Sequence, residues 1–287
     1  QESRGLGDVY KRQVEALPLG NGRIGAMVFG DPVHEQFQLN EETVWGGSPY
    51  NNTNPKAKDA LPRIRQLIFE GKNKEAQELC GPTICSPSAN GMPYQTVGSL
   101  HLDFDGINNY NDYYRDLDIA KAIATTRFTA NGVTYTREAY TSFPDQVLVI
   151  RLTASQKKSI SFTAKYTTPY KSNVVRSISS RKELQLSGKA NDHEGIEGKV
   201  EFTALTRIEN NGGSLEATSD STLQVKNANS VTLYVSIGTN FVNYKDVSGN
   251  ALNTAQKYLK QVNKNYAKSK AAHINAYQKL SLIHISE

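Results

Sequence analysis

The 287-residue chain is poor in cysteine, methionine and tryptophan, and it has no long apolar run. It contains two cysteines, two methionines and one tryptophan. Because no apolar run approaches the roughly 20 residues that a membrane-spanning helix needs, we expect no membrane partner. The two cysteines are too few for a zinc site, since the five histidines do not lie at ligand spacing from them or from one another. We therefore expect no metal.

Charge of one sign is not concentrated in any segment. The chain has 33 basic and 28 acidic residues, and its formal net charge is +5. The basic clusters are short, for example Lys56/Lys58 and Lys72/Lys74, and other lysines follow the segment 257–279. A nucleic-acid-binding protein usually carries a basic stripe or a recognisable module. We expect no nucleic-acid partner, and we interpret these lysines as a solvated helix face.

Sequence motifs for cofactors and for nucleophilic catalysis are also missing. The chain has no phosphate loop and no Gly-x-Ser-x-Gly elbow. Gly20, Gly22 and Gly25 match the spacing of the dinucleotide fingerprint. However, they precede an apolar run that is typical of a strand and not of a helix, so the context is wrong. The sequence therefore predicts no cofactor.

The most informative segment that is present covers residues 17–47. A Gly-rich turn, Gly20–Gly25, leads into the apolar run Ile24–Phe29, which predicts a buried strand. Asp31-Pro32 is typical of a turn. After it, apolar and polar residues alternate over 36–40, which predicts a second strand with one solvated face. The segment is expected to form a β-hairpin with polar residues clustered at its ends.

Period-two patterns continue from Tyr94 to Phe241. Asn131-Gly132 between two such patterns is a strong hairpin signal. Val147–Leu152 is apolar except for Arg151, which predicts a buried strand. More than ten strands separated by turns predict an all-β fold, a large antiparallel β-sandwich.

Two segments show helical periodicity. Pro55–Leu79 follows Asn54, which we expect to cap the helix. Gly71 interrupts this segment and predicts either a kink or a helix–turn–helix. Ala251–Leu280 has a partial apolar stripe and predicts a second helix of about thirty residues.

Several motifs in a fixed order resemble the N-terminal domain of glycoside hydrolase family 95. In chain order they are PLGNGRIGAMVFG, QLNEETVWGG, NPKAKDALPRIRQLIFEGKNKEAQEL, Met92–Leu100, Tyr114–Asp118, Gly132–Glu138, Phe143–Val147 and Ser236–Phe241. The resemblance covers roughly residues 14–280. It implies a β-supersandwich over 14–250 and a linker helix over 251–280 that leads toward an (α/α)6 catalytic barrel.

The resemblance also implies a function. Family members are inverting α-L-fucosidases, and some act on α-L-galactosides. Their general acid Glu and their water-activating Asn and Asp residues lie in the barrel. We expect no catalytic residue in this chain, which alone should be inactive, and no cofactor. The partners implied are the barrel and, through it, a fucosylated oligosaccharide. The alternatives are the same domain of an α-L-galactosidase or a stand-alone carbohydrate-binding sandwich. Family membership further implies a bacterial, periplasmic or secreted protein.

The two ends of the chain do not fit this resemblance. Residues 1–13, QESRGLGDVYKRQ, and residues 281–287, SLIHISE, resemble translated sequencing-adapter sequence in metagenomic assemblies. We expect both segments to be non-native and the chain to be a gene fragment.

Five polar or aromatic residues of segment 17–47 are candidate site residues: Asn21, Arg23, Asn40, Glu41 and Trp45. Aromatic rings suit the apolar faces of sugars, and Asn and Arg suit pairs of hydroxyl groups. Three interpretations stay open. The residues brace an interface with the barrel, or they line the rim of the sugar site. Alternatively they are structural, with Arg23 paired to Glu41 or to its neighbour and Trp45 in a core gap.

Cys80 and Cys85 are separated by Gly-Pro-Thr-Ile. Two thiols that close a Pro-containing loop are a candidate disulfide in an oxidising compartment. Two free thiols are the alternative.

Overall fold

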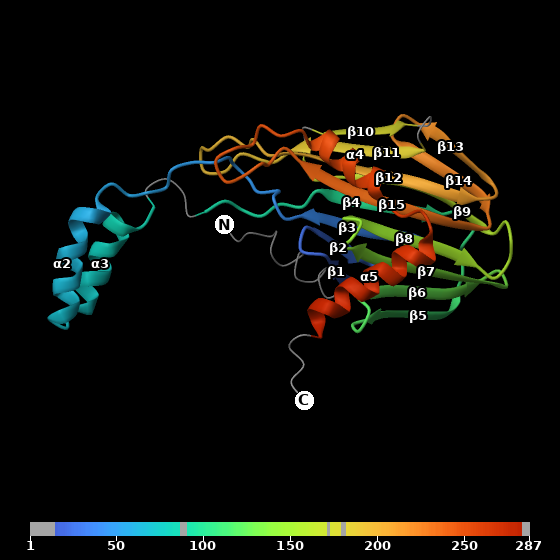
Figure 1. Cartoon of the computed structure of the whole chain (residues 1–287), viewed down its shortest axis with the longest axis horizontal. Coiled ribbons are helices and arrows are strands. Elements are labelled where there is room, and N and C mark those ends of the chain that lie inside the picture. Colours follow the sequence, from blue (N-terminus) through green and yellow to red (C-terminus); the bar gives the residue numbers. More distant parts are fainter. Residues whose placement is uncertain (1–14, 87–90, 171–172, 179–181, 283–287) are drawn as a thin grey trace.

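The protein is a β-sandwich with a helical arm and two helices packed on its outer face (Figure 1). This is a computed structural model, and it describes residues 15–86, 91–170, 173–178 and 182–282. The predicted segment 1–13 lies outside the described residues. Of segment 281–287, only Ser281 and Leu282 are described, and they end the last helix.

Two antiparallel sheets form the sandwich, which confirms the all-β prediction. The seven-stranded sheet has the order β1 (Leu17–Gly20), β2 (Ile24–Val28), β3 (His34–Glu41), β4 (Gly98–Phe104), β9 (Ile160–Thr167), β14 (Thr222–Ala228) and β13 (Ser214–Ser219). The eight-stranded sheet has the order β10 (Asn173–Ile178), β11 (Glu183–Lys189), β12 (Glu201–Asn211), β15 (Ser230–Thr239), β8 (Val147–Ala154), β7 (Val133–Ser142), β6 (Ile123–Ala130) and β5 (Asn111–Asp118).

The strands β8 and β15 lie at the centre of the eight-stranded sheet and are covered on both faces. All ten residues of β15 are buried. Leu233 packs into the main core between the two sheets, whereas Tyr234 packs into a second cluster under the C-terminal helices. Leu148 and Val149 of β8 divide between the two cores in the same way. This double burial explains why the four residues Val147–Ile150 are all apolar.

The turns follow the local sequence. Asn131 and Gly132 connect β6 and β7 with φ values of 51° and 74°, the left-handed conformation that a two-residue hairpin turn requires. The alternation expected over residues 94–241 is absent from β5 and β13, because each lies at a sheet edge and is half-buried or exposed along its length. Such strands show no alternation of apolar and polar residues.

The predicted single C-terminal helix is wrong, because the segment forms two helices. These are α4 (Ala251–Gln261) and α5 (Tyr266–Ser281). The chain leaves the helical conformation at Val262, and the side chain of Asn265 caps α5 by accepting the Lys268 N–H. Both helices pack on the outer face of the eight-stranded sheet (Figure 1). A good capping residue inside an apolar stripe therefore marks a new helix start.

The predicted helix–turn–helix after residue 55 is confirmed. It consists of α2 (Ala57–Phe69) and α3 (Asn73–Ile84), with Gly71 at a φ of 72° in the turn. We call this hairpin the arm, because Figure 1 shows it standing away from the sandwich. The Asn54 side chain does make a capping hydrogen bond, since its Oδ1 accepts the Lys56 N–H at 3.0 Å. However, the residue directly before α2 is Lys56, which makes no side-chain cap. The Asn54 amide also donates to the carbonyls of Pro82 and Cys85 and closes the base of the arm.

Candidate functional site

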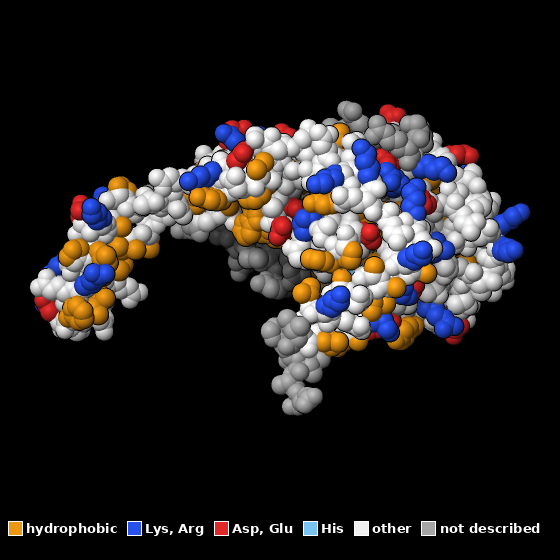
Figure 2. All heavy atoms as spheres, viewed as in Figure 1, with side chains coloured by type: hydrophobic (Ala, Val, Ile, Leu, Met, Phe, Trp, Pro, Cys, Tyr) orange, Lys and Arg blue, Asp and Glu red, His pale blue; other side chains and the backbone are white. Residues whose placement is uncertain are grey.

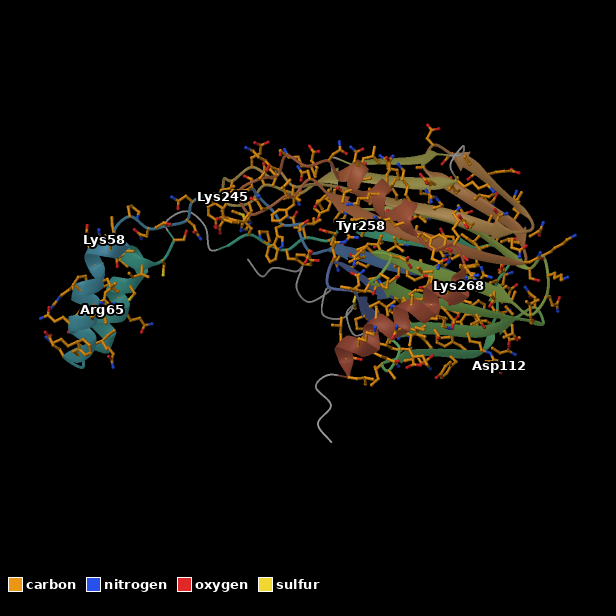
Figure 3. The ribbon with its side chains drawn as sticks, in the orientation of Figure 1. Lys58, Arg65, Asp112, Lys245, Tyr258 and Lys268 are labelled. Carbon is orange, nitrogen blue, oxygen red and sulfur yellow. The ribbon has the colours of Figure 1, made fainter. Side chains whose placement is uncertain are left out.

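Loops from both sheets gather at the end of the sandwich from which the arm extends. We call this the loop end, and it comprises residues 42–50, 91–97, 190–200 and 240–250. Backbone hydrogen bonds join the loops, since Gly46 N–H donates to Pro93 O and Gly47 N–H to Asn191 O, both at 2.9 Å. Gly47 has a φ of 65°, and a Cβ there would lie 2.5 Å from Met92 Sδ. Figure 3 shows Lys245 at this end of the molecule.

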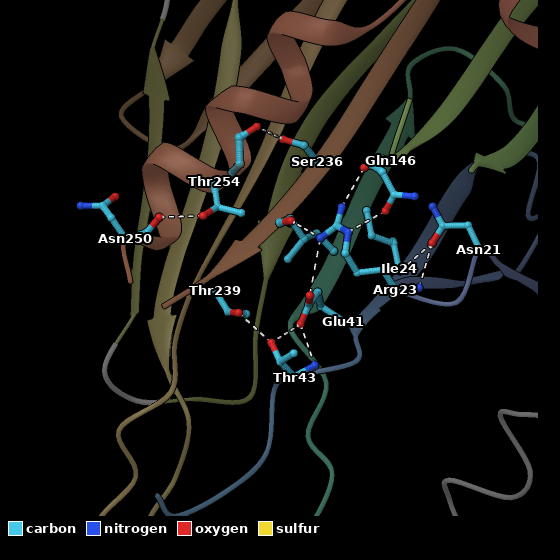
Figure 4. Close-up of polar contacts among 12 residues, drawn as sticks. Asn21, Arg23, Ile24, Glu41, Thr43, Gln146, Ser236, Thr239, Asn250 and Thr254 are labelled. Carbon is cyan, nitrogen blue, oxygen red and sulfur yellow. Dashed lines mark hydrogen bonds and ion pairs between the residues drawn. The ribbon is translucent and has the colours of Figure 1, made fainter. Parts of the chain in front are cut away.

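Arg23 is the centre of a polar network beside the loop end (Figure 4). Its Nε donates to Gln146 Oε1 at 2.8 Å, and its NH2 nitrogen donates to Gln146 O at 2.8 Å. Its NH1 nitrogen donates to the Ile237 carbonyl at 2.6 Å and lies 3.5 Å from Glu41 Oε1. The guanidinium also lies over the ring of Tyr258, with Cζ 4.1 Å from the ring centroid. Arg23 thus links both sheets and α4.

Glu41 is almost fully buried beneath this network. Its Oε2 accepts hydrogen bonds from the Thr43 N–H at 2.8 Å and from Thr43 Oγ1 at 2.6 Å. Thr43 Oγ1 also lies 2.6 Å from Thr239 Oγ1 on β15. Burial raises the pKa of Glu41, while the Thr43 hydrogen bonds and the Arg23 charge oppose this rise. The carboxylate therefore joins the two sheets and has no open side toward a substrate.

Asn21 shapes the turn that precedes β2. Its Oδ1 accepts the N–H groups of Arg23 at 3.1 Å and Ile24 at 2.8 Å, and its Nδ2 donates to Ser142 O at 3.0 Å. Asn40 is half-buried on β3, where it pairs with Gly25. The structure therefore brings Asn21, Arg23 and Glu41 together, as the structural interpretation predicts for Arg23.

Trp45 belongs to a different feature, an exposed aromatic pair on the loop end. Its ring meets that of Tyr94 edge to face, with centroids 5.3 Å apart, and the two residues are 45% and 47% exposed. The indole N–H donates to the Glu42 carbonyl at 2.8 Å and fixes the ring. The expectation that Trp45 fills a core gap is therefore wrong. Tyr94 was not singled out from the sequence, although it lies inside the Met92–Leu100 motif.

The buried carboxylates among the described residues are occupied by structural partners. The four buried ones pair as follows: Glu35 with Arg137, Glu41 with Arg23 and Thr43, Asp145 with Ser142 and Ser269, and Glu183 with Arg207. Surface examples are the ion pairs of Asp103 with Lys165 and of Glu197 with Lys189. An open groove along α4 is lined by Glu183, Arg207, Gln256, Leu259 and Lys260, so its one carboxylate is already paired. Glycoside hydrolysis normally uses two carboxyl groups across a sugar, and each of the four buried carboxylates is held by other side chains.

Asp145 is a residue whose importance the sequence did not indicate. Its Oδ2 accepts hydrogen bonds from Ser142 Oγ at 3.0 Å and from Ser269 Oγ of α5 at 2.8 Å. Its Oδ1 accepts the Asn263 N–H, between α4 and α5, at 3.4 Å. Asp145 therefore fixes the break between the two helices. Asp145 lies in the Phe143–Val147 motif, and this motif is the sequence feature that could have pointed to it.

The remaining predictions concern cysteine, metal and membrane. Cys80, in α3, and Cys85, at its C-terminal cap, are both free thiols in the structure. Among the described residues, no group of three or more His, Cys, Asp or Glu side chains is arranged to hold a metal ion. None of the described helices has the length and apolarity to cross a membrane.

Two curated relatives are similar to most of this chain. Alpha-L-fucosidase 2 from Arabidopsis thaliana is 29% identical over an alignment of 312 positions. The match covers 96% of this chain and 35% of the relative. Probable alpha-fucosidase A from Aspergillus oryzae is 27% identical over 237 residues, which cover 79% of this chain and 31% of the relative. The chain thus spans about a third of the length of these relatives.

The fold is similar to that of a solved structure described as "Putative kojibiose phosphorylase from human microbiome". The TM-score is 0.50 at 10% identity, and the match covers 92% of this chain and 35% of that one. At this identity the match concerns the fold alone. The family model described as "Glycosyl hydrolase family 65, N-terminal domain" matches residues 8–244. The chain therefore belongs to this family of glycosyl hydrolase N-terminal domains, in agreement with its resemblance to the corresponding domain of the α-fucosidases.

Proposed function

We propose that the chain is the non-catalytic N-terminal domain of an inverting α-L-fucosidase that releases terminal α-linked L-fucose from oligosaccharides. The observation that carries this proposal is the similarity of 96% of the chain to one third of an α-L-fucosidase. The engagement of every buried carboxylate in ion pairs or hydrogen bonds supports the non-catalytic role. The inverting stereochemistry rests on the resemblance to family 95.

The domain's task in this proposal is to support a catalytic domain through the loop end. Trp45 is held there by its indole hydrogen bond and by the ring contact with Tyr94, and both residues are exposed. Exposed aromatic residues are typical anchors of protein interfaces, and they also suit sugar rings. Arg23 and Glu41 act behind this surface, because they hold the two sheets and α4 in a fixed relation.

Hydrolysis assays test the proposal. The 287-residue chain and the intact protein, extended by the sequence that follows in the gene, would each be incubated with an aryl α-L-fucoside and with 2′-fucosyllactose. We expect the intact protein to release fucose, first as the β-anomer seen by NMR, and the chain alone to release none. Release by the chain alone would contradict the non-catalytic role, and α-fucose as first product would contradict inversion.

The same assay with an aryl α-L-galactoside decides between the two sugar specificities.

A second candidate function, a carbohydrate-binding sandwich, is favoured by the exposed Trp45–Tyr94 pair. Binding of fucosylated glycans by the chain alone, abolished by Trp45→Ala, would support it. Lack of binding together with activity of the intact protein supports the enzyme domain.

A further inference from the structure

The arm carries apolar side chains that nothing in the described chain covers. Its own core consists of Ile64, Leu67 and Ala76, with partly buried neighbours from the same two helices. Four large apolar side chains of the arm remain exposed: Leu61 (40%), Ile68 (51%), Phe69 (86%) and Ile84 (41%). Figure 2 shows hydrophobic side chains gathered on the visible face of the arm.

The arm is too small to be stable without a further contact. The helices α2 and α3 have 13 and 12 residues. Isolated helices of about this length are marginal in water, and helices in proteins derive most of their stability from packing an apolar face. Three buried side chains and the Asn54 hydrogen bonds at the base supply little of that packing. A partner surface over the exposed side chains would supply further packing.

The size of the exposed face indicates what kind of partner this is. Given the exposed fractions of the four side chains, the apolar area is on the order of 400 Å². A standard interface buries roughly 800 Å² on each partner, and a little more than half of that area is apolar, so the four side chains match the apolar part of one such interface. The chain spans about a third of the length of alpha-L-fucosidase 2, and a further domain in a protein of that length would be tethered to the arm and present at a high effective concentration.

The position of the arm agrees with a tethered partner. Figure 1 shows that the arm extends from the loop end and that α5 ends at the lower side of the sandwich. Leu280, near the end of α5, is 57% exposed, and Trp45 on the loop end is 45% exposed. Exposed apolar side chains thus occur on the arm, on the loop end and at the end of α5.

We propose that the arm docks on the catalytic domain of the same polypeptide through Leu61, Ile68, Phe69 and Ile84, with Phe69 at its tip as the principal anchor. This inference rests on the proposed function, since it requires a catalytic domain downstream. Phe69 is 86% exposed, an unusual position for a Phe side chain unless a partner buries it.

Hydrogen–deuterium exchange tests the docking without using a substrate. We expect the amides of α2 and α3 to exchange at least about tenfold more slowly in the intact protein than in the 287-residue chain. The double variant Ile68→Ala/Phe69→Ala in the intact protein should abolish this difference. The control Tyr114→Ala removes an aromatic side chain that is 56% exposed on β5, and it should leave the protection unchanged.

Two outcomes would overturn the inference. Equal exchange in both proteins would show that the arm is not docked. Protection that disappears on dilution would identify a second copy as the partner. Fucoside hydrolysis is measured in parallel. An active intact protein with an unprotected arm refutes the docking alone, whereas a protected arm in a protein inactive on fucosides refutes the proposed substrate alone.

Discussion

The guanidinium of Arg23 lies over the ring of Tyr258, with Cζ 4.1 Å from the ring centroid. Arg23 precedes β2 in the seven-stranded sheet, and Tyr258 belongs to α4 on the far face of the eight-stranded sheet. The same guanidinium donates to the Ile237 carbonyl on β15. One side chain thus fixes three layers that are far apart in the sequence.

Arg23→Ala is expected to destabilise the chain by roughly 2–4 kcal/mol, because it removes a half-buried hydrogen-bond network and leaves the buried Glu41 without its cation. Arg23→Lys should recover only part of this loss, since an ammonium group cannot reproduce the planar set of donors. Urea denaturation measures the effect. The control is Arg65→Ala on the exposed surface of the arm. A loss for Arg23→Ala no larger than for this control would show that the network is not structural.

Gly238 permits the close approach of α4 to β15. A Cβ at this position would lie 2.5 Å from Ala251 O and 2.6 Å from Ala255 N, both backbone atoms. Gly238→Ala should therefore displace α4 and lower the melting temperature by several degrees. Gly81→Ala is the matched control, because a Cβ there meets nothing within 4 Å and alanine favours a helix. Equal melting temperatures for the two variants would contradict the close packing.

Glu35 and Arg137 form a buried ion pair between the two sheets, with Oε2 and NH1 2.9 Å apart. The Arg137 guanidinium also lies over Phe104, 4.1 Å from the ring centroid. Glu35→Gln leaves the guanidinium uncompensated and should cost about 3–5 kcal/mol. The double variant Glu35→Gln/Arg137→Met should lose less than the sum of the two single variants, since neither charge then remains unpaired. Additive losses, measured by urea denaturation, would show that the pair is not coupled.

His273 makes the packing of α5 sensitive to acid. Burial lowers the pKa of its imidazole, while hydrogen bonds to backbone carbonyls partly oppose this. Its Nε2 lies 2.9 Å from Lys121 O, and its ring stacks on Tyr140 with centroids 4.6 Å apart. A lowered pKa means that the unfolded chain binds the proton more tightly, so stability is lost as pH falls below the ordinary pKa of about 6.5.

The measurement is the urea concentration at the midpoint of unfolding, determined at a series of pH values from 7.5 to 5.5. His273→Gln should reduce the decline with acid, because glutamine can donate to Lys121 O and does not titrate. His193→Gln, in a surface loop, is the control and should keep the decline of the unmodified chain. The same decline in all three proteins would rule out His273 as the source.

Trp45→Ala in the intact protein separates the two functional interpretations of the loop end. The side chain is 45% exposed, so we expect the unfolding free energy of the isolated domain to change by less than about 1 kcal/mol. If Trp45 braces an interface, the catalytic domain should detach, with separate melting transitions. If it lines the sugar site, KM should rise and the single transition should remain. An unchanged KM together with an unchanged transition would contradict both roles.

Much of the fold could be predicted from local sequence patterns. Asn131-Gly132 predicted the β6–β7 hairpin, and the largely apolar segment Val147–Leu152 predicted a buried strand. Gly71 predicted the turn of the arm. These features depend on near neighbours in the chain, because turn conformation and the period of burial are set within a few residues.

The candidate site could be predicted only in part. Arg23 and Glu41 were singled out, but the partners that determine their role lie far along the chain, at Gln146, Ile237 and Tyr258. Local periodicity carries no information on such pairings, since a polar residue in a turn has the same pattern whether it faces solvent or another sheet.

The sequence by itself determined the sandwich class, most of its strands and its family, because alternation, turn residues and ordered motifs are properties of short segments. The tertiary structure alone decided that Arg23 joins three layers and that Asp145 fixes the break between α4 and α5. It also decided that the Phe69 side chain of the arm is exposed. These relationships depend on which distant surfaces pack together, and that choice is made by the summed burial and hydrogen bonding of the whole domain.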